Sequence, residues 1–108
     1  MGLVLVRAVI REEKLSDVLK ALVDKGYQGA TVYRVMGMGG EGGVVKIEER
    51  LHPVLIPRVV VEVIADEKET GELIKIITES ARTGKVGDGR IFVIPTSKTV
   101  RIRTGEEQ

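Results

Sequence analysis

The chain has 108 residues, which is enough for one domain and too few for two. Its 17 Lys and Arg side chains nearly balance 16 Asp and Glu side chains, and aromatic residues make up only 3%, so we expect no nucleic-acid partner. Because cysteine is absent, disulfides, thiol nucleophiles and zinc–thiolate sites are excluded.

The first part of the chain predicts a strand, a helix and a second strand. Residues 3–10 form a Val- and Leu-rich run of strand length, too short to cross a bilayer. Leucine and valine then recur at helical spacing from Leu15 to Val23, and Gly26 can end that helix. Residues 31–35 alternate polar and apolar side chains, as a strand does. With no signal-peptide pattern after Met1, we expect a cytoplasmic protein without direct membrane insertion.

Glycine dominates the segment that follows. Five of the seven residues from Gly37 to Gly43 are glycine, which disfavours both helix and strand. Residues 44–50 predict a short hairpin arm, and Pro53 and Pro57 bracket its return. Because long connections in small domains are often functional, we interpret residues 37–56 as a functional loop.

The second part of the chain repeats the strand–helix–strand order of the first. Residues 58–64 predict a strand, Asp66 and Glu69 form a D-x-x-E capping signal before a helix, and residues 91–94 and 99–103 predict two further strands. The order predicts an α+β, ferredoxin-like split βαβ sandwich (βαββαβ) with both helices on one sheet face. A long loop joins its second and third strands, and a short strand ends the chain.

Two segments are candidates for binding phosphate groups. The turn at 83–90 reads Thr-Gly-Lys-Val-Gly-Asp-Gly-Arg, and free backbone N–H groups in such a turn form a nest for anions. The alternative is a helix C-cap followed by a tight turn. Arg101 and Arg103 alternate on the predicted tail strand and should point to one face, as bidentate phosphate contacts require. The alternative there is an edge strand protected by charge.

These segments resemble the PII family of nitrogen-regulatory signal-transduction proteins. The match rests on RTGKVGDGRIFVIP (82–95), VRIRTGE (100–106), VIREEKLSDVLKALVDKG (9–26) and VMGMGG (35–40), with the spacing between the first two. It extends over nearly the whole chain and weakens only within 37–56. The resemblance implies a single PII-like domain over 1–108, with 37–56 as its T-loop. It also implies a homotrimer that binds ATP or ADP between subunits and is not an enzyme.

The resemblance further implies which residues bind the nucleotide. The 83–90 turn corresponds to the family's phosphate-binding B-loop, the tail arginines reach the phosphates from the adjacent subunit, and the start of the T-loop packs along ribose and phosphates. Three strand residues surround adenine and ribose. The implied set is Thr31, Gly37, Met38, Gly39, Gly40, Glu62, Ile64, Gly87, Asp88, Gly89, Arg90, Arg101 and Arg103.

The T-loop departs from the family pattern in two ways. Residues 37–56 contain no Tyr, Ser or Thr, so we expect neither uridylylation nor phosphorylation there. Glu41 stands where the family has a glutamine that helps bind Mg²⁺ and 2-oxoglutarate, with Arg11 and Arg58 at neighbouring basic positions. A carboxylate can ligate Mg²⁺ but repels a dicarboxylate, so we predict weak or absent 2-oxoglutarate binding.

Three functions remain open from the sequence. The first is a PII signalling protein whose T-loop contacts an ammonium transporter, a nitrogen-assimilation enzyme or nitrogenase, and we favour this one. The second is a PII-like adenine-nucleotide sensor that regulates a transporter or enzyme outside nitrogen assimilation. The third is a small phosphatase on the same fold, for which Asp88 is the only carboxylate in the 83–90 turn. His52 has no companion ligands and is read as a loop residue.

Overall fold

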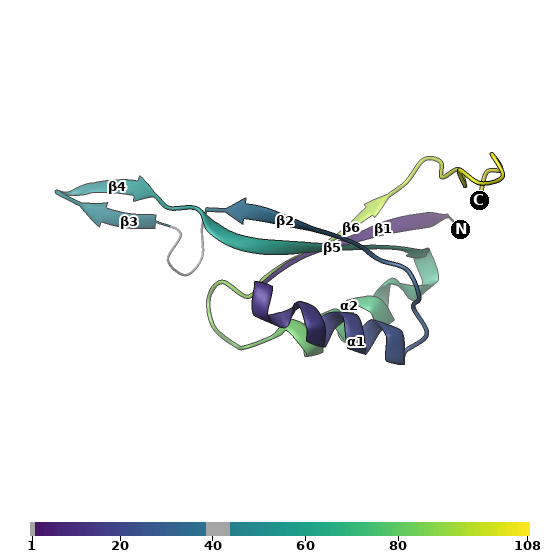
Figure 1. The fold of residues 1–108 in the computed structure, drawn as a ribbon, viewed down its shortest axis with the longest axis horizontal. Coiled ribbons are helices and arrows are strands. Elements are labelled where there is room, and N and C mark those ends of the chain that lie inside the picture. Colours follow the sequence, from purple (N-terminus) through teal and green to yellow (C-terminus); the bar gives the residue numbers. More distant parts are fainter. Residues whose placement is uncertain (1, 39–43) are drawn as a thin grey trace.

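A four-stranded antiparallel sheet forms the body of the molecule, and two helices cover one of its faces (Figure 1). The computed structural model describes residues 2–38 and 44–108. The strands of this sheet run in the order β2-β5-β1-β6, which confirms the ferredoxin-like α+β fold. Its elements are β1 (Leu3–Ile10), α1 (Leu15–Asp24), β2 (Thr31–Gly37), β5 (Ile56–Asp66), α2 (Thr70–Ala81) and β6 (Gly89–Pro95).

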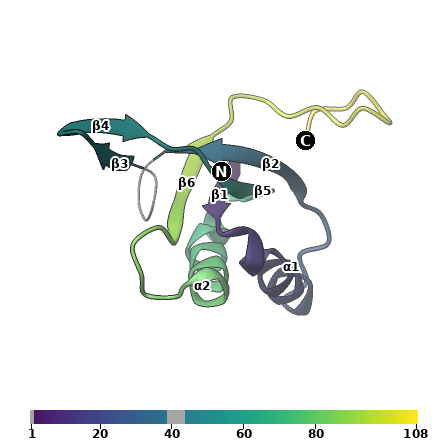
Figure 2. The same cartoon turned by 60° about the vertical axis from the view of Figure 1, so that its left-hand side comes forward.

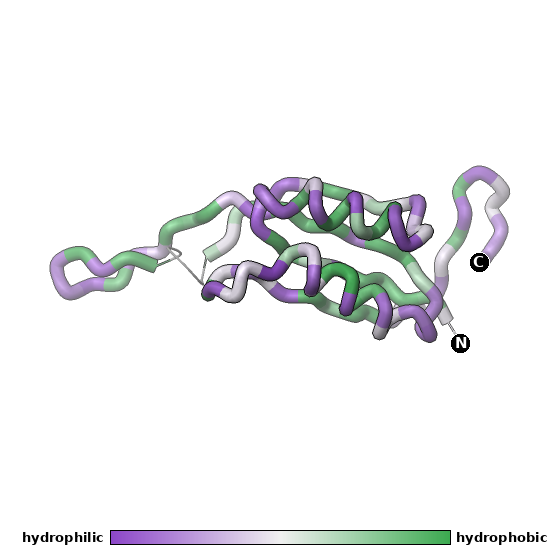
Figure 3. Tube along the Cα trace, turned by 90° about the horizontal axis from the view of Figure 1, so that it is seen from below, coloured by the Kyte–Doolittle hydropathy of each residue, from purple (hydrophilic) through white to green (hydrophobic). Residues whose placement is uncertain are grey.

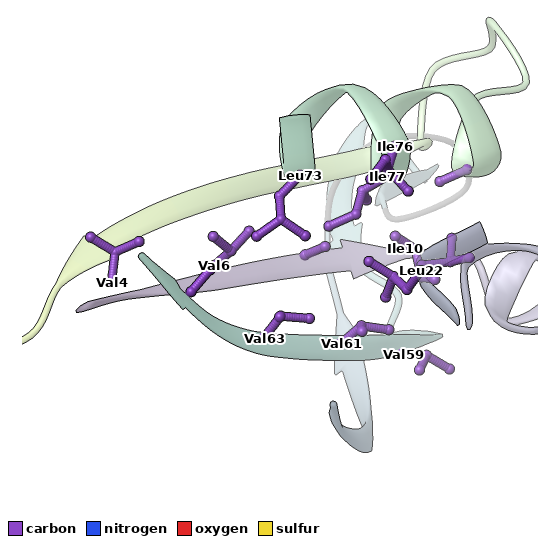
Figure 4. Packing of buried hydrophobic residues seen from close by; sticks show 14 residues of the cluster. Val4, Val6, Ile10, Leu22, Val59, Val61, Val63, Leu73, Ile76 and Ile77 are labelled. Carbon is purple, nitrogen blue, oxygen red and sulfur yellow. The ribbon is translucent and has the colours of Figure 1, made fainter. Parts of the chain in front are cut away.

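The core lies between the sheet and the helices. Alternate residues of β1 and β5 point inward because side chains in a strand alternate between the two faces. The helices α1 and α2 lie side by side against these residues, as Figures 2 and 3 show. The buried side chains of the four elements meet in one cluster, shown in Figure 4: Val4, Val6, Ala8, Ile10, Val18, Leu22, Val59, Val61, Val63, Ala65, Leu73, Ile76, Ile77 and Ala81.

Short 3-10 turns lead into both helices. The turn before α1 spans Glu12–Lys14, and the turn before α2 spans Glu67–Glu69. Asp66 accepts a hydrogen bond from the Lys68 N–H, while the Glu69 carboxylate accepts one from the Asp66 N–H. This capping box, predicted from the D-x-x-E spacing, is therefore confirmed.

A hairpin arm projects from one end of the sheet (Figure 1). Its strands β3 (Val44–Ile47) and β4 (Arg50–Pro53) pair with each other in a separate two-stranded sheet. Glu48 and Glu49, which join them, both have positive φ values of 50° and 65°, as a type I′ turn requires. The arm predicted within 37–56 is therefore confirmed, and it gives the chain a long dimension of 57 Å against 27 and 22 Å.

The tail differs from its prediction. No strand forms over 99–103; instead, Val100 makes an isolated bridge to Glu107. The Gly105 N–H bonds to the Arg101 carbonyl, and the Arg101 N–H bonds to the Glu106 carbonyl, so the tail folds back on itself. The prediction that Arg101 and Arg103 share one face of a strand is therefore wrong, because the tail pairs with itself and has no sheet strand beside it.

Candidate functional site

The loop at 83–90 joins α2 to β6 and is organised around one carboxylate. Asp88 Oδ2 accepts hydrogen bonds from the N–H groups of Thr83 at 2.8 Å and Gly84 at 2.9 Å, and Oδ1 accepts one from the Thr83 hydroxyl. Gly84, Gly87 and Gly89 all have positive φ, which suits glycine. The Asp88 carboxylate is thus used within the loop, and its direct contact with a nucleotide stays a prediction.

Arg11 contacts the same loop from the end of β1. Its Nε donates to Asp88 Oδ1 at 3.0 Å, and its Nη2 donates to the Val86 carbonyl at 3.0 Å. The Arg11 side chain is only 12% exposed and that of Asp88 24%. Sequence reasoning expected Arg11 near 2-oxoglutarate, and the structure places it against the loop.

The hydrogen bonds to Asp88 make the loop sensitive to acid. Donation from the Thr83 hydroxyl and N–H, with smaller contributions from Arg11 and Gly84, holds the Asp88 pKa far below its usual value. Because the folded pKa is depressed, this stabilisation is complete above the unfolded pKa of about 4 and is lost as pH falls toward the folded pKa.

We therefore expect the stability difference between the wild type and Asp88→Asn to shrink in acid. Denaturant midpoints of both proteins, measured from about pH 6 to about pH 2, should lie far apart at the upper end and converge at the lower end. Other carboxylates titrate in both proteins, so they cancel in the difference. Parallel curves would contradict the role given to the Asp88 charge.

A second cluster of polar side chains lies on the sheet face that the helices leave uncovered. Glu62 Oε2 accepts from Arg7 Nε at 2.7 Å and from the Tyr33 hydroxyl at 2.8 Å. Tyr33 and then Arg7 lower the pKa of Glu62, and the bond to Glu62 raises the pKa of Tyr33. In the strand register Thr31, Glu62 and Arg7 lie in one row.

Sequence reasoning selected Glu62 and missed its two partners. Arg7 is the only charged residue in an otherwise apolar strand, and that isolation was the available signal. Tyr33 carried no signal, because its link to Glu62 depends on the pairing of β2 with β5.

Two separate hollows contain most of the expected nucleotide residues. One, of about 390 Å³, lies beside the 83–90 loop and includes Gly37, Met38, Gly87, Gly89 and Arg90 in its lining, together with Arg58. The other, of about 770 Å³, includes Thr31, Glu62 and Ile64. The two linings share no residue. The predicted nucleotide residues Gly39 and Gly40, and Glu41 of the predicted Mg²⁺ and 2-oxoglutarate site, lie outside the described residues.

The two hollows lie toward opposite ends of the sheet. Arg90 pairs with Val9 near one end of β1, whereas Leu5 and Ile64 pair near the other end. β6 runs from the 83–90 loop at the first end to the tail at the second, a span of about 20 Å for seven residues (Figure 1). Arg101 and Arg103 follow β6 and therefore lie beyond its far end, away from Arg90 of the same chain.

The helices within residues 2–38 and 44–108 lack the length and apolar character that a membrane span requires. The same residues contain no cluster of three or more His, Asp or Glu side chains that could hold a metal ion.

Comparisons with known proteins agree with the family resemblance found in the sequence. Residues 3–106 match the family model described as nitrogen regulatory protein P-II. The chain is 38% identical over 104 residues to nitrogen regulatory protein P-II of Pasteurella multocida, covering 94% of this chain and 93% of that protein. It is 42% identical over 103 residues to P-II 1 of Methanothermobacter thermautotrophicus, covering 94% and 90%. It is also similar to the crystal structure of Arabidopsis thaliana PII bound to citrate, with 32% identity, a TM-score of 0.81, and coverage of 99% of this chain and 86% of that one.

Proposed function

The chain belongs to the nitrogen regulatory protein P-II family, and on that premise we propose that it is a homotrimeric signal-transduction protein that binds ATP or ADP between its subunits. Members of this family are regulators and not enzymes, which agrees with the expectation from the sequence. The proposal keeps the single domain over 1–108 and the cytoplasmic location expected from the sequence.

The observation that carries the proposal is the division of the expected site. Gly87, Gly89 and Arg90 lie where β6 begins, and Glu62 lies in the middle of the sheet, opposite Arg7. The tail arginines follow the far end of β6. One nucleotide cannot bridge about 20 Å between phosphate contacts of the same chain. Two copies that place opposite ends of their sheets together would form a complete site, which a closed ring of identical subunits repeats at every interface.

The polar composition of the two halves suits a nucleotide. The first half offers the guanidinium group of Arg90 and the glycine backbone of the loop, which can donate to phosphate oxygens. The second half offers the Glu62 carboxylate, whose Oε2 accepts both bonds from Arg7 and Tyr33. Its Oε1 can then accept a bond from a ribose hydroxyl, while Ile64 supplies an apolar surface for the base.

A mixing experiment tests whether the site is shared between subunits. We expect Arg90→Ala and Arg101→Ala each to weaken ATP binding about 10- to 100-fold, because each removes a charged hydrogen-bond donor. When the two variants are unfolded, mixed in equal amounts and refolded together, about a quarter of the sites should combine two intact halves and regain wild-type affinity.

Calorimetric titration with ATP and Mg²⁺ reads out this result. Recovery of tight sites supports a shared site, whereas no recovery means that both arginines act within one chain. If the wild-type protein itself binds no ATP, the nucleotide part of the proposal is wrong.

The same titration, repeated with 2-oxoglutarate present, tests the ligand preference. We propose that 2-oxoglutarate binds weakly or not at all because Glu41 would repel it, while Mg²⁺ can accompany ATP. ATP affinity should then stay the same when 2-oxoglutarate is added. Tighter ATP binding in its presence would contradict this part of the proposal.

We also propose that residues 37–56 act as the T-loop and contact the regulated protein. Val45, Ile47 and Leu51 are exposed on the hairpin arm, where apolar side chains gain from burial against a partner. An ammonium transporter, a nitrogen-assimilation enzyme or nitrogenase are the proposed classes of target.

A further inference from the structure

We propose that Arg11 is a positioning residue that holds the 83–90 loop in its phosphate-binding shape, an inference that rests on the proposed function. The sequence placed Arg11 near a dicarboxylate ligand. Its contacts in the structure give it a different role, within the protein itself.

The guanidinium group of Arg11 bonds to two points of the loop at once. One N–H group reaches the Asp88 carboxylate and another reaches the Val86 carbonyl, each at 3.0 Å. These two points flank Gly87, whose φ of 101° lies in the left-handed region that favours glycine. A planar guanidinium presents several donors in fixed directions, whereas a lysine ammonium is a single donor atom on a flexible stem.

Arg11 directly follows the buried end of β1, an inner strand of the sheet. Ile10, the residue before it, is 2% exposed and pairs with Gly89 at the start of β6. The other side-chain hydrogen bonds found in the loop stay within it, joining Thr83 or Gly84 to Asp88 and Lys85 to Thr83. Among the described residues, Arg11 therefore provides the side-chain hydrogen bonds that connect this loop to the central strand.

Arg11 also offsets a charge that would oppose the ligand. Asp88 lies between Gly87 and Gly89, which line the hollow proposed for phosphate groups. An unpaired carboxylate there would repel phosphate. The ion pair with Arg11 and the bonds from Thr83 and Gly84 direct that negative charge into the loop. Arg90 and the glycine backbone are then left to face the hollow.

The test compares Arg11→Lys with a matched arginine variant. Arg34 also forms an ion pair, with Glu12, but its side chain is 81% exposed and it lies on the edge strand β2. We expect Arg11→Lys to weaken ATP binding about tenfold and to leave adenosine binding unchanged, because adenosine has no phosphate group. Arg34→Lys should change neither affinity.

Calorimetry with ATP, and competition by adenosine, measure these affinities. A selective loss of ATP affinity supports the inference. Unchanged ATP affinity in Arg11→Lys, or an equal loss for adenosine, would overturn it, since an equal loss indicates general damage to the fold.

Amide hydrogen exchange tests the role of Arg11 without requiring that the protein bind ATP. If the wild type binds no ATP, the proposed function fails, and exchange at Thr83 and Gly84 decides whether Arg11 holds the loop. If the amide groups of Thr83 and Gly84 exchange several-fold faster in Arg11→Lys than in Arg34→Lys, the result supports Arg11 as the residue that holds the loop. Equal exchange rates in the two variants would overturn it.

Discussion

Replacing Gly89 with alanine is expected to lower the free energy of unfolding by about 3 kcal/mol and to abolish nucleotide binding. A Cβ atom on Gly89 would lie 1.8 Å from the carbonyl oxygen and 2.9 Å from the carbonyl carbon of Val9. Both atoms belong to the backbone of the central strand β1, so they cannot move aside without disrupting its pairing with β6. The φ of 109° adds backbone strain for any side chain.

Gly84→Ala is the matched control for Gly89→Ala. Gly84 has a similar φ of 88°, but nothing lies within 4 Å of an added Cβ, so only the strain of about 1–2 kcal/mol should remain. Urea denaturation of the wild type and both variants, at one protein concentration because assembly affects apparent stability, measures the difference. Equal losses in the two variants would show that the contact with Val9 contributes nothing.

Leu73→Ala is expected to destabilise the protein by about 3 kcal/mol, because it leaves a cavity in the centre of the core. The Leu73 side chain is 0% exposed and points from α2 toward the sheet near Val6 (Figure 4). β-Strand backbones on the opposite side of the cavity limit how far the site can collapse. Denaturant midpoints measure the loss.

Ile74→Ala is the control for the loss of helix side-chain volume. Ile74 is the next residue of α2 and is 39% exposed, so its truncation removes less buried surface and should cost below about 1 kcal/mol. A loss similar to that of Leu73→Ala would mean that Ile74 is covered in solution, for example by another subunit. The two variants together thus separate core packing from surface coverage.

Local patterns predicted most of the fold. The apolar run of β1, the helical spacing in α1 and the D-x-x-E signal before α2 each depend on neighbouring residues, and each corresponds to an element of the structure. The hairpin arm was predictable because it follows a glycine-rich segment and needs no distant partner. The prediction of a strand at 99–103 failed because it depends on a distant partner. The tail residues suit a strand, but a strand in the sheet also needs a neighbouring strand, and the fold places none there.

The sequence names candidate residues for the site, but it does not show which of them contact one another. Glycines and arginines with the family's spacing mark where a phosphate group should bind, and the family match supports that reading. The pair of Arg11 and Asp88 joins residues 77 positions apart, and that of Arg7 and Glu62 joins residues 55 positions apart. Such pairs follow from strand register, which a single sequence does not contain.

The central place of β1 in the sheet has a consequence for how the protein folds. β1 is the first strand of the chain, yet it pairs with β5 and with β6, the last strand. Every hydrogen bond that it forms in the sheet must therefore close a large loop of chain, and such closure slows folding. During synthesis β1 emerges long before either neighbour, so its apolar side chains have no sheet partner until β5 is made and lack β6 for longer still. The 83–90 loop, which Arg11 ties to β1, can take its final shape only at that last stage.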